Sequence, residues 1–264
     1  RALGLRLGHA HRPGRAGREA GVRPPAPGPD DAVPVRRVVS PLEGGAEGSG
    51  TNGQPVPQGK GYIESRYMTT GYFNNIGLFF GSFNPIHLGH LIIAQYALEF
   101  TDLDEVWFII SPHNPFKDKK TLLADHHRYY MVNMAVEDIP RLRASNIEFS
   151  MPQPSYTINT LTYLHEKYPE KRLVLLTGSD VLPTFHKWKN YDQILQFYEL
   201  YVYPRPYTED HPYKDHPKIK FIDAPMMDIS SSFIRESISK GKNVSFLLQD
   251  KIYRHIMEMH FYEE

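Results

Sequence analysis

The sequence predicts an α/β fold, a doubly wound, Rossmann-like parallel sheet completed by C-terminal helices. From residue 71 onward, short apolar runs alternate with segments whose apolar residues follow helical spacing. The clearest runs are 105–110 (EVWFII), which is apolar after Glu105, and 173–177 (LVLLT). Continuous apolar strands that are separated by helices are typical of a parallel sheet covered on both faces.

The first part of the chain has a different composition. Residues 1–67 hold 9 of the 22 prolines and 13 of the 19 glycines, and no Phe, Tyr or Trp precedes Tyr62. Such a segment cannot bury enough apolar surface to offset the entropy lost on ordering. We therefore expect a disordered N-terminal extension or non-native segment over 1–70 and one folded domain over 71–264.

Three interpretations of residues 1–67 remain. Ten Lys and Arg against six Asp and Glu give it about +4, but the arginines are scattered, whereas a basic nucleic-acid arm clusters them. A transit peptide would be richer in serine and poorer in acids. A tag, linker or translated upstream sequence is favoured, because the first methionine is Met68.

Composition excludes several classes of site and partner. The chain has no cysteine, so it has no disulfide, thiolate nucleophile or iron–sulfur cluster, which suits a cytoplasmic protein. The formal net charge is zero, which favours neither nucleic acid nor an anionic membrane as partner. No apolar run approaches the roughly 20 residues of a membrane span.

The predicted elements follow one another in alternation. Strands are expected over 76–80, 105–110, 143–149, 173–177, 200–203 and 219–222, and helices over 88–100, 124–138, 157–168, 180–185, 191–197, 231–240 and 250–259. Asp125 is a plausible N-cap for the second helix. Ligands of such sheets bind beyond the carboxyl ends of the strands, where the strand order reverses.

Residues 81–90 (GSFNPIHLGH) join the first strand to the first helix. Gly81 and Gly89 let the backbone approach a ligand closely. His87 and His90 are three residues apart and share one face of a helical turn. Because a helix N-terminus presents free N–H groups, this segment predicts a polyphosphate site.

Residues 229–235 (ISSSFIR) are the second strong feature. The serine hydroxyls and free N–H groups of a helix start can hold phosphate oxygens. Arg235 adds a planar, permanently charged guanidinium.

The first string is similar to the GxFxPxHxGH pattern of the nucleotidyltransferase superfamily, and the second resembles its ISSTxIR motif, with Ser232 in place of threonine. Further matches are His127-Arg128, PSYT at 154–157, GSD at 178–180 and Trp188. In this order, over about residues 73–264, they resemble bacterial nicotinate-nucleotide adenylyltransferases. Three departures are Phe80 for a second glycine, Asn84 for aspartate, and a reordered Pro/His loop before Lys117.

The resemblance implies a nucleotidyltransferase domain over 71–264 that moves AMP from ATP to nicotinate mononucleotide, forming nicotinate adenine dinucleotide and pyrophosphate in NAD biosynthesis. It implies ATP as co-substrate and Mg²⁺ that bridges the triphosphate without dedicated protein ligands. We expect no nucleic-acid or membrane partner, and the protein could form a homo-oligomer. The alternatives are an adenylyltransferase of the same superfamily that acts on nicotinamide mononucleotide, and a non-catalytic nucleotide-binding protein.

The resemblance also implies roles for individual residues. Catalytic roles fall to His87, His90, Lys117 and Arg235. The nucleotide would be contacted by Gly81, Ser82, Phe83, Gly89, Gly178, Asp180, Ile229, Ser230, Ser231 and Ser232, and the mononucleotide by Ser155, Tyr156, Thr157 and Trp188. The nucleophile would be a phosphate monoester with a second pKa of ~6, so no general base is required.

Overall fold

The computed structural model describes residues 74–112, 122–206 and 213–263, which belong to one compact unit within residues 62–264. The expected disordered segment over 1–70 lies outside the described residues. The strands are β1 (Asn75–Gly81), β2 (Glu105–Ile110), β3 (Leu142–Ser145), β4 (Arg172–Gly178), β5 (Glu199–Tyr203) and β6 (Ile219–Phe221). The helices are α2 (Leu88–Phe100), α3 (Asp125–Val136), α4 (Thr157–Lys167), α5 (Tyr191–Phe197), α6 (Ser231–Ser239) and α7 (Asp250–Glu258), with short 3₁₀ helices η3 (Ile147–Ser150), η4 (Ser179–Lys187) and η5 (Ser245–Leu247).

The described strands form one six-stranded sheet in the order β3-β2-β1-β4-β5-β6, and every neighbouring pair is parallel. The predicted fold class is therefore confirmed. The chain moves outward from β1 in one direction and returns to add β4 on the other side, so the strand order reverses between β1 and β4. A ligand site is expected where the loops after these two strands diverge.

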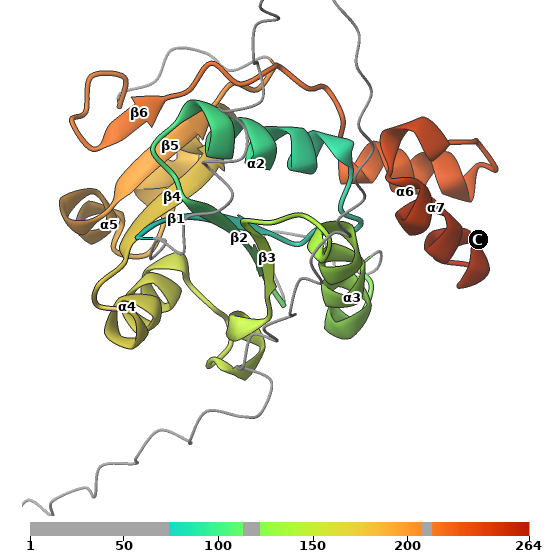
Figure 1. Ribbon diagram of the computed structural model, residues 1–264, viewed down its shortest axis with the longest axis horizontal. Helices are drawn as coiled ribbons and strands as arrows, with labels where there is room; N and C mark the ends of the chain where they lie inside the picture. The colour runs from blue at the N-terminus through green and yellow to red at the C-terminus, as the bar shows by residue number, and fades with distance from the viewer. Residues whose placement is uncertain (1–73, 113–121, 207–212, 264) are drawn as a thin grey trace, which may run out of the picture. The chain divides into compact units, whose positions relative to one another are not determined.

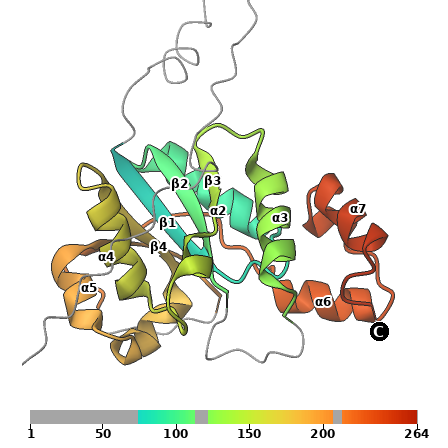
Figure 2. The ribbon, with the colours of Figure 1, turned by 90° about the horizontal axis from the view of Figure 1, so that it is seen from below.

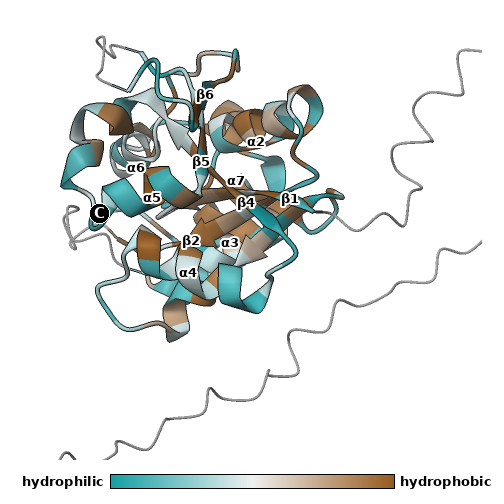
Figure 3. Ribbon diagram, turned by 90° about the vertical axis from the view of Figure 1, so that its left-hand side faces the viewer, coloured by the Kyte–Doolittle hydropathy of each residue, from teal (hydrophilic) through white to brown (hydrophobic). Residues whose placement is uncertain are grey.

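Helices cover both faces of the sheet, as Figure 1 shows. On one face, Phe79, Phe108 and Leu176 pack with the apolar sides of α2, α3, α6 and α7. On the other, Leu78 and Leu175 pack with α4, η4 and α5. Figure 3 colours the strands mainly as hydrophobic, which agrees with side chains buried on both sides.

The C-terminal helices α6 and α7 lie beside α3 (Figures 1 and 2). Ile234 and Ile238 of α6, with Ile252 and Ile256 of α7, are buried in the same apolar cluster as α2 and α3. This packing brings the end of the chain to the carboxyl end of β1. Within the described ranges, no helix has the length and apolar character needed to cross a bilayer.

Two local predictions were wrong. The N-cap of α3 is Ala124, and the Asp125 carboxylate instead pairs with the buried guanidinium of Arg128. The strand expected over 143–149 ends at Ser145, and Ile147–Ser150 turns as a 3₁₀ helix. That turn buries the carboxylate of Glu148, which accepts hydrogen bonds from Ser155 and Thr160.

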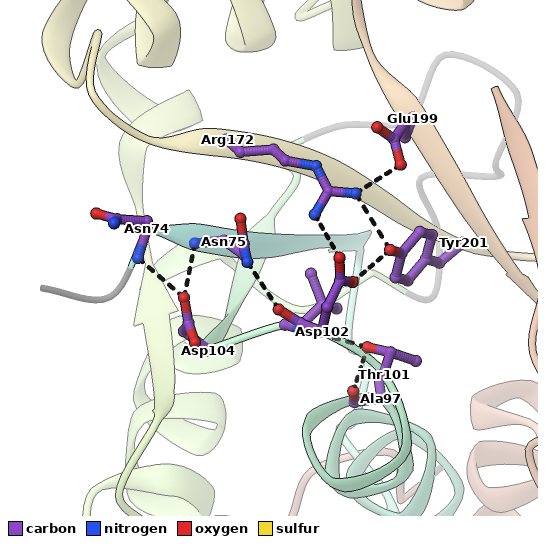
Figure 4. Close-up of polar contacts among 10 residues, drawn as sticks. Asn74, Asn75, Ala97, Thr101, Asp102, Asp104, Arg172, Glu199 and Tyr201 are labelled. Atoms are coloured by element: carbon purple, nitrogen blue, oxygen red, sulfur yellow. Dashed lines mark hydrogen bonds and ion pairs between the residues drawn. The ribbon is translucent and has the colours of Figure 1, made fainter. Parts of the chain in front are cut away.

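A polar network joins the amino ends of the strands, opposite the expected site (Figure 4). Arg172 donates to Asp102 at 2.8 Å and to Glu199 at 2.5 Å, while the Tyr201 hydroxyl donates to Asp102. Burial acts to raise the pKa of Asp102, but the hydrogen bonds from Tyr201 and Arg172 outweigh it and the pKa is lowered. The network thus ties β4 and β5 to the turn before β2.

Candidate active site

The two predicted histidines lie together at the start of α2. His87 is the N-cap and His90 is in the first turn, and their rings stack with centroids 3.7 Å apart. The backbone N–H of His87 donates to Nδ1 of His90 at 3.3 Å. Because Nδ1 accepts this hydrogen bond, a ring proton of His90 lies on Nε2.

His87 is almost fully buried, with 5% of its surface exposed. Burial lowers its pKa to about 4, and the positive charge of Arg205 acts in the same direction. Its Nδ1 atom is buried without a hydrogen-bond partner among the described residues, because the N–H of His90 donates instead to the His87 carbonyl at 3.0 Å. His87 is therefore a neutral imidazole at neutral pH.

The rest of the predicted loop supports this pair. Gly81 ends β1, and the carbonyl of Ser82 accepts a hydrogen bond from Arg128 at 2.7 Å. Phe83, with a φ of 44°, is buried and packs edge-on against His90 with ring centroids 5.0 Å apart. Its ring belongs to the core, so only its backbone remains available for the predicted nucleotide contact.

Gly89 allows a close approach between the two predicted motifs. A Cβ there would lie 3.1 Å from the His87 ring and 3.6 Å from the Cβ of Ile229. A Cβ at this position would crowd the imidazole and would lie in ordinary van der Waals contact with Ile229 before α6.

The second motif sits directly against the histidine loop. Ser230 is the N-cap of α6 and its hydroxyl accepts the N–H of Phe233 at 3.1 Å. The hydroxyl of Ser231 donates to the carbonyl of Pro85 at 2.9 Å, and Arg235 donates to the carbonyl of Asn84 at 2.8 Å. The structure therefore joins two segments that are about 140 residues apart in the sequence.

The guanidinium of Arg235 donates hydrogen bonds from both of its terminal nitrogens. Its Nη1 holds the loop, its Nη2 donates to the exposed Ser232 hydroxyl at 3.2 Å, and its Nε is buried without a partner among the described residues. The charge is thus fixed beside the start of α6.

The loop after β4 brings a third predicted group to this edge. A Cβ on Gly178 would lie 2.3 Å from Oδ1 of Asp180 and 2.9 Å from Cγ of Arg205. Asp180 is exposed, and its Oδ1 lies 4.0 Å from Nε of Arg205. The backbone N–H of Arg205 donates to the Ser179 hydroxyl at 2.9 Å. The ends of β4 and β5 are thereby joined beside the His87 loop.

The predicted mononucleotide residues form a separate group at the start of α4. Thr157 begins the helix and Tyr156 is its N-cap, with the ammonium of Lys189 4.5 Å from the Tyr156 ring centroid. Lys189 follows Trp188, which is half-buried and 5.3 Å from Phe185 between ring centroids. The contact between Lys189 and Tyr156 thus links the predicted pyridine-binding segments.

Ser155 lies in the turn before α4, and its contact with the mononucleotide stays a prediction. Its hydroxyl donates to the buried carboxylate of Glu148 at 3.1 Å. In this arrangement Ser155 supports the turn before α4. Lys117, the fourth predicted catalytic residue, lies outside the described residues.

Two arginines organise the site: sequence reasoning missed Arg205 and gave Arg128 no role. Arg205 follows the carboxyl end of β5, and its position after a buried strand is a signal that could have found it. Arg128 is fully buried and donates to the carbonyls of Ser82, Ser111 and Pro112 at 2.7 to 2.9 Å. It belongs to a matched motif, but no local pattern indicates that its guanidinium gathers the loops after β1 and β2.

A surface cavity of about 550 Å³ lies elsewhere, along α6 and the segment after it. It is lined by Phe233, Glu236, Ser237, Lys240, Lys242, Asn243, Val244, Phe246 and Leu247. This cavity shares no residue with the predicted site. The candidate site is therefore defined by its histidines, its arginines and the helix N-termini, and not by the cavity.

Comparisons with known proteins identify the family. A family model described as cytidylyltransferase-like matches residues 78–237. A probable nicotinate-nucleotide adenylyltransferase of Flavobacterium psychrophilum is 51% identical over 191 residues, covering 72% of this chain and 99% of the relative. A protein of the same description from Bacteroides fragilis is 43% identical over 182 residues, covering 69% of this chain and 90% of the relative.

Solved structures share the fold. Nicotinic acid mononucleotide adenylyltransferase of Plasmodium falciparum, complexed with NaAD, superposes with a TM-score of 0.63 at 20% identity, over 72% of this chain and 97% of that one. A putative nicotinate-nucleotide adenylyltransferase of Vibrio parahaemolyticus gives a TM-score of 0.55 at 19% identity, over 72% and 96% of the two chains. With the family model and the close relatives, the fold and the paired motifs lead to one conclusion: the chain belongs to the nicotinate-nucleotide adenylyltransferases of the cytidylyltransferase-like family.

Proposed function

We propose that the chain transfers AMP from ATP to nicotinate mononucleotide. The observation that carries the proposal is that Arg235 of α6 is held against the loop of His87 and His90 at the strand-order reversal, through the contacts of Ser231 with Pro85 and of Arg235 with Asn84. The names of close relatives support the choice of substrates. The mononucleotide phosphate oxygen attacks the α-phosphorus of ATP, and pyrophosphate leaves with the electrons of the broken P–O bond.

The protein's task in this reaction is to position two anions and stabilise the growing negative charge. His90 presents an Nε2 donor, and the neutral His87 ring lies stacked against it. Arg235 and the start of α6 supply a fixed cation and free N–H groups for the triphosphate. Because these groups need no rearrangement during the reaction, they favour the transition state over the substrates.

Neither a general base nor a protein metal cage is needed. The attacking phosphate is mostly ionised at neutral pH, since its second pKa is ~6. We propose that Mg²⁺ enters bound to the ATP phosphates and water, the usual mode for this ion. The described residues hold no group of three or more metal-ligating side chains that would replace those ligands.

The mononucleotide is assigned to the start of α4. Free N–H groups and the positive end of the helix favour a carboxylate there. Trp188 offers an aromatic face for the pyridine, and Asp180 offers an acceptor for ribose hydroxyls. Lys117 is assigned to the triphosphate as the sequence predicts.

The test is pyrophosphate release from ATP with each of two acceptors, the acid and the amide mononucleotide. We expect faster turnover with nicotinate mononucleotide, since only its carboxylate is favoured by the α4 N-terminus. Preference for nicotinamide mononucleotide would overturn the acceptor assignment. Absence of release with either acceptor would leave a nucleotide-binding protein without this activity.

A further inference from the structure

The residues after α7 form a turn that packs against the core. After α7, His260 adopts a φ of 51°, and the N–H groups of His260 and Phe261 donate to the carbonyls of Met257 at 3.3 Å and Ile256 at 3.0 Å. This pairing is a Schellman motif, which satisfies the last carbonyls of a helix. Phe261 is buried against the rings of His127 and His255, so the direction of the next residue is fixed.

The next residue, Tyr262, reaches into the catalytic loop. Its hydroxyl donates to Oδ1 of Asn84 at 2.8 Å. Asn84 is 3% exposed, and the same Oδ1 atom accepts the N–H of Leu123 at 3.3 Å. The carbonyl of Asn84 is the atom that anchors Arg235. The buried residue Asn84 therefore contacts three parts of the fold: Tyr262 after α7, Leu123 before α3, and Arg235 of α6.

The Tyr262 hydroxyl is suited to act as a neutral donor. Burial raises its pKa well above the ordinary range, while the nearby positive charges of Arg235 and Arg128 partly oppose that rise. A protonated phenol can donate to only one acceptor, and Asn84 supplies it.

We propose that Tyr262 is a positioning residue for adenylyl transfer, which acts by holding Asn84 and, through it, the relative placement of the histidine loop and Arg235. Tyr262 touches no reacting atom in this scheme. The inference rests on the proposed function and adds to it a requirement for the C-terminal turn. Arg235 donates to the backbone carbonyl of Asn84, and Tyr262 donates to its side-chain Oδ1. Holding the side chain in place therefore helps to hold the carbonyl that Arg235 contacts.

The test compares full-length Tyr262→Phe with Tyr253→Phe. Tyr253 is a half-buried tyrosine of α7 that packs on the same cluster. We expect Tyr262→Phe to lower kcat about fivefold to tenfold, the effect of one lost neutral hydrogen bond. The far-UV spectrum should match that of the control, which should keep wild-type kcat.

A double-mutant cycle distinguishes positioning from simple destabilisation. If Tyr262 acts through Asn84, Tyr262→Phe should lower kcat no further in an Asn84→Ala background. Additive losses, an unchanged kcat, or a loss that disappears after correction for the folded fraction would each overturn the proposal.

The proposed function and this inference fail in different ways. Wild-type protein that releases no pyrophosphate refutes the function. The positioning role is then tested by the Kd of a non-hydrolysable ATP analogue, which should weaken in Tyr262→Phe and stay unchanged in Tyr253→Phe. Equal Kd values for the two variants would overturn the inference in that case.

Discussion

Protonation of His87 should destabilise the folded protein in mild acid. Its pKa falls from an ordinary 6.5 to about 4 in the folded state, chiefly through burial. The unfolded chain therefore binds a proton between these values and the folded chain does not, so this contribution to stability is present above pH 6.5 and is lost as pH falls toward 4. The full shift corresponds to about 3 kcal/mol, of which about 2 kcal/mol is lost between pH 7.5 and 5.0.

The assay is urea unfolding of wild-type protein and His87→Gln at pH 7.5, 6.0 and 5.0. Other titrating groups affect both proteins alike, so the difference in unfolding free energy isolates His87. We expect that difference to shift by about 2 kcal/mol in favour of the variant on going to pH 5.0. The matched control His126→Gln, which removes an exposed histidine of α3, should show no comparable shift.

A constant difference between wild type and His87→Gln across these pH values would refute the reasoning. It would mean that the imidazole is hydrated or charged in the folded protein. The conclusion that His87 is a buried, neutral imidazole would then be wrong.

Four further outcomes are expected. His90→Ala should lower turnover by about 10²-fold or more, measured as pyrophosphate release, while circular dichroism shows an intact fold, because a donor to the transition state is lost. Asp102→Asn should lower the unfolding free energy by about 1 kcal/mol or less at pH 7, because the carboxylate is half exposed, and should leave turnover unchanged. The difference should shrink as pH falls below 3.8 and through the lower pKa that Tyr201 and Arg172 give the folded-state carboxyl; a loss of activity would contradict its place at the amino ends of the strands. Arg128→Met should cost about 3 kcal/mol or more in denaturant unfolding, since several buried carbonyls lose their donor; a loss under 1 kcal/mol would show that those carbonyls find other donors. The kcat/KM for the mononucleotide should fall below pH ~6 in both wild type and His87→Gln, because the titrating group is the substrate phosphate; loss of that limb in the variant would assign it to His87.

Local patterns predicted most of the architecture. The apolar runs at 105–110 and 173–177 correspond to β2 and to the centre of β4, and helix α2 has the bounds expected from its motif. These features could be read because a strand or helix is encoded within about ten neighbouring residues. The hydrogen bond from Ser155 to Glu148 could not be predicted from a local pattern, because it depends on which hydroxyl the fold brings close to the buried carboxylate.

The sequence alone determined the family, the succession of strands and helices along the chain, and the two motifs, because each depends on contiguous residues. The tertiary structure decided how these motifs meet. Asn84 receives hydrogen bonds from residues 39, 151 and 178 positions away, and only folding brings those donors to one buried residue. The same holds for the pKa of His87, which depends on burial by distant parts of the chain and on Arg205. Burial and long-range hydrogen bonding are properties of the packed chain, and for that reason no local pattern encodes them.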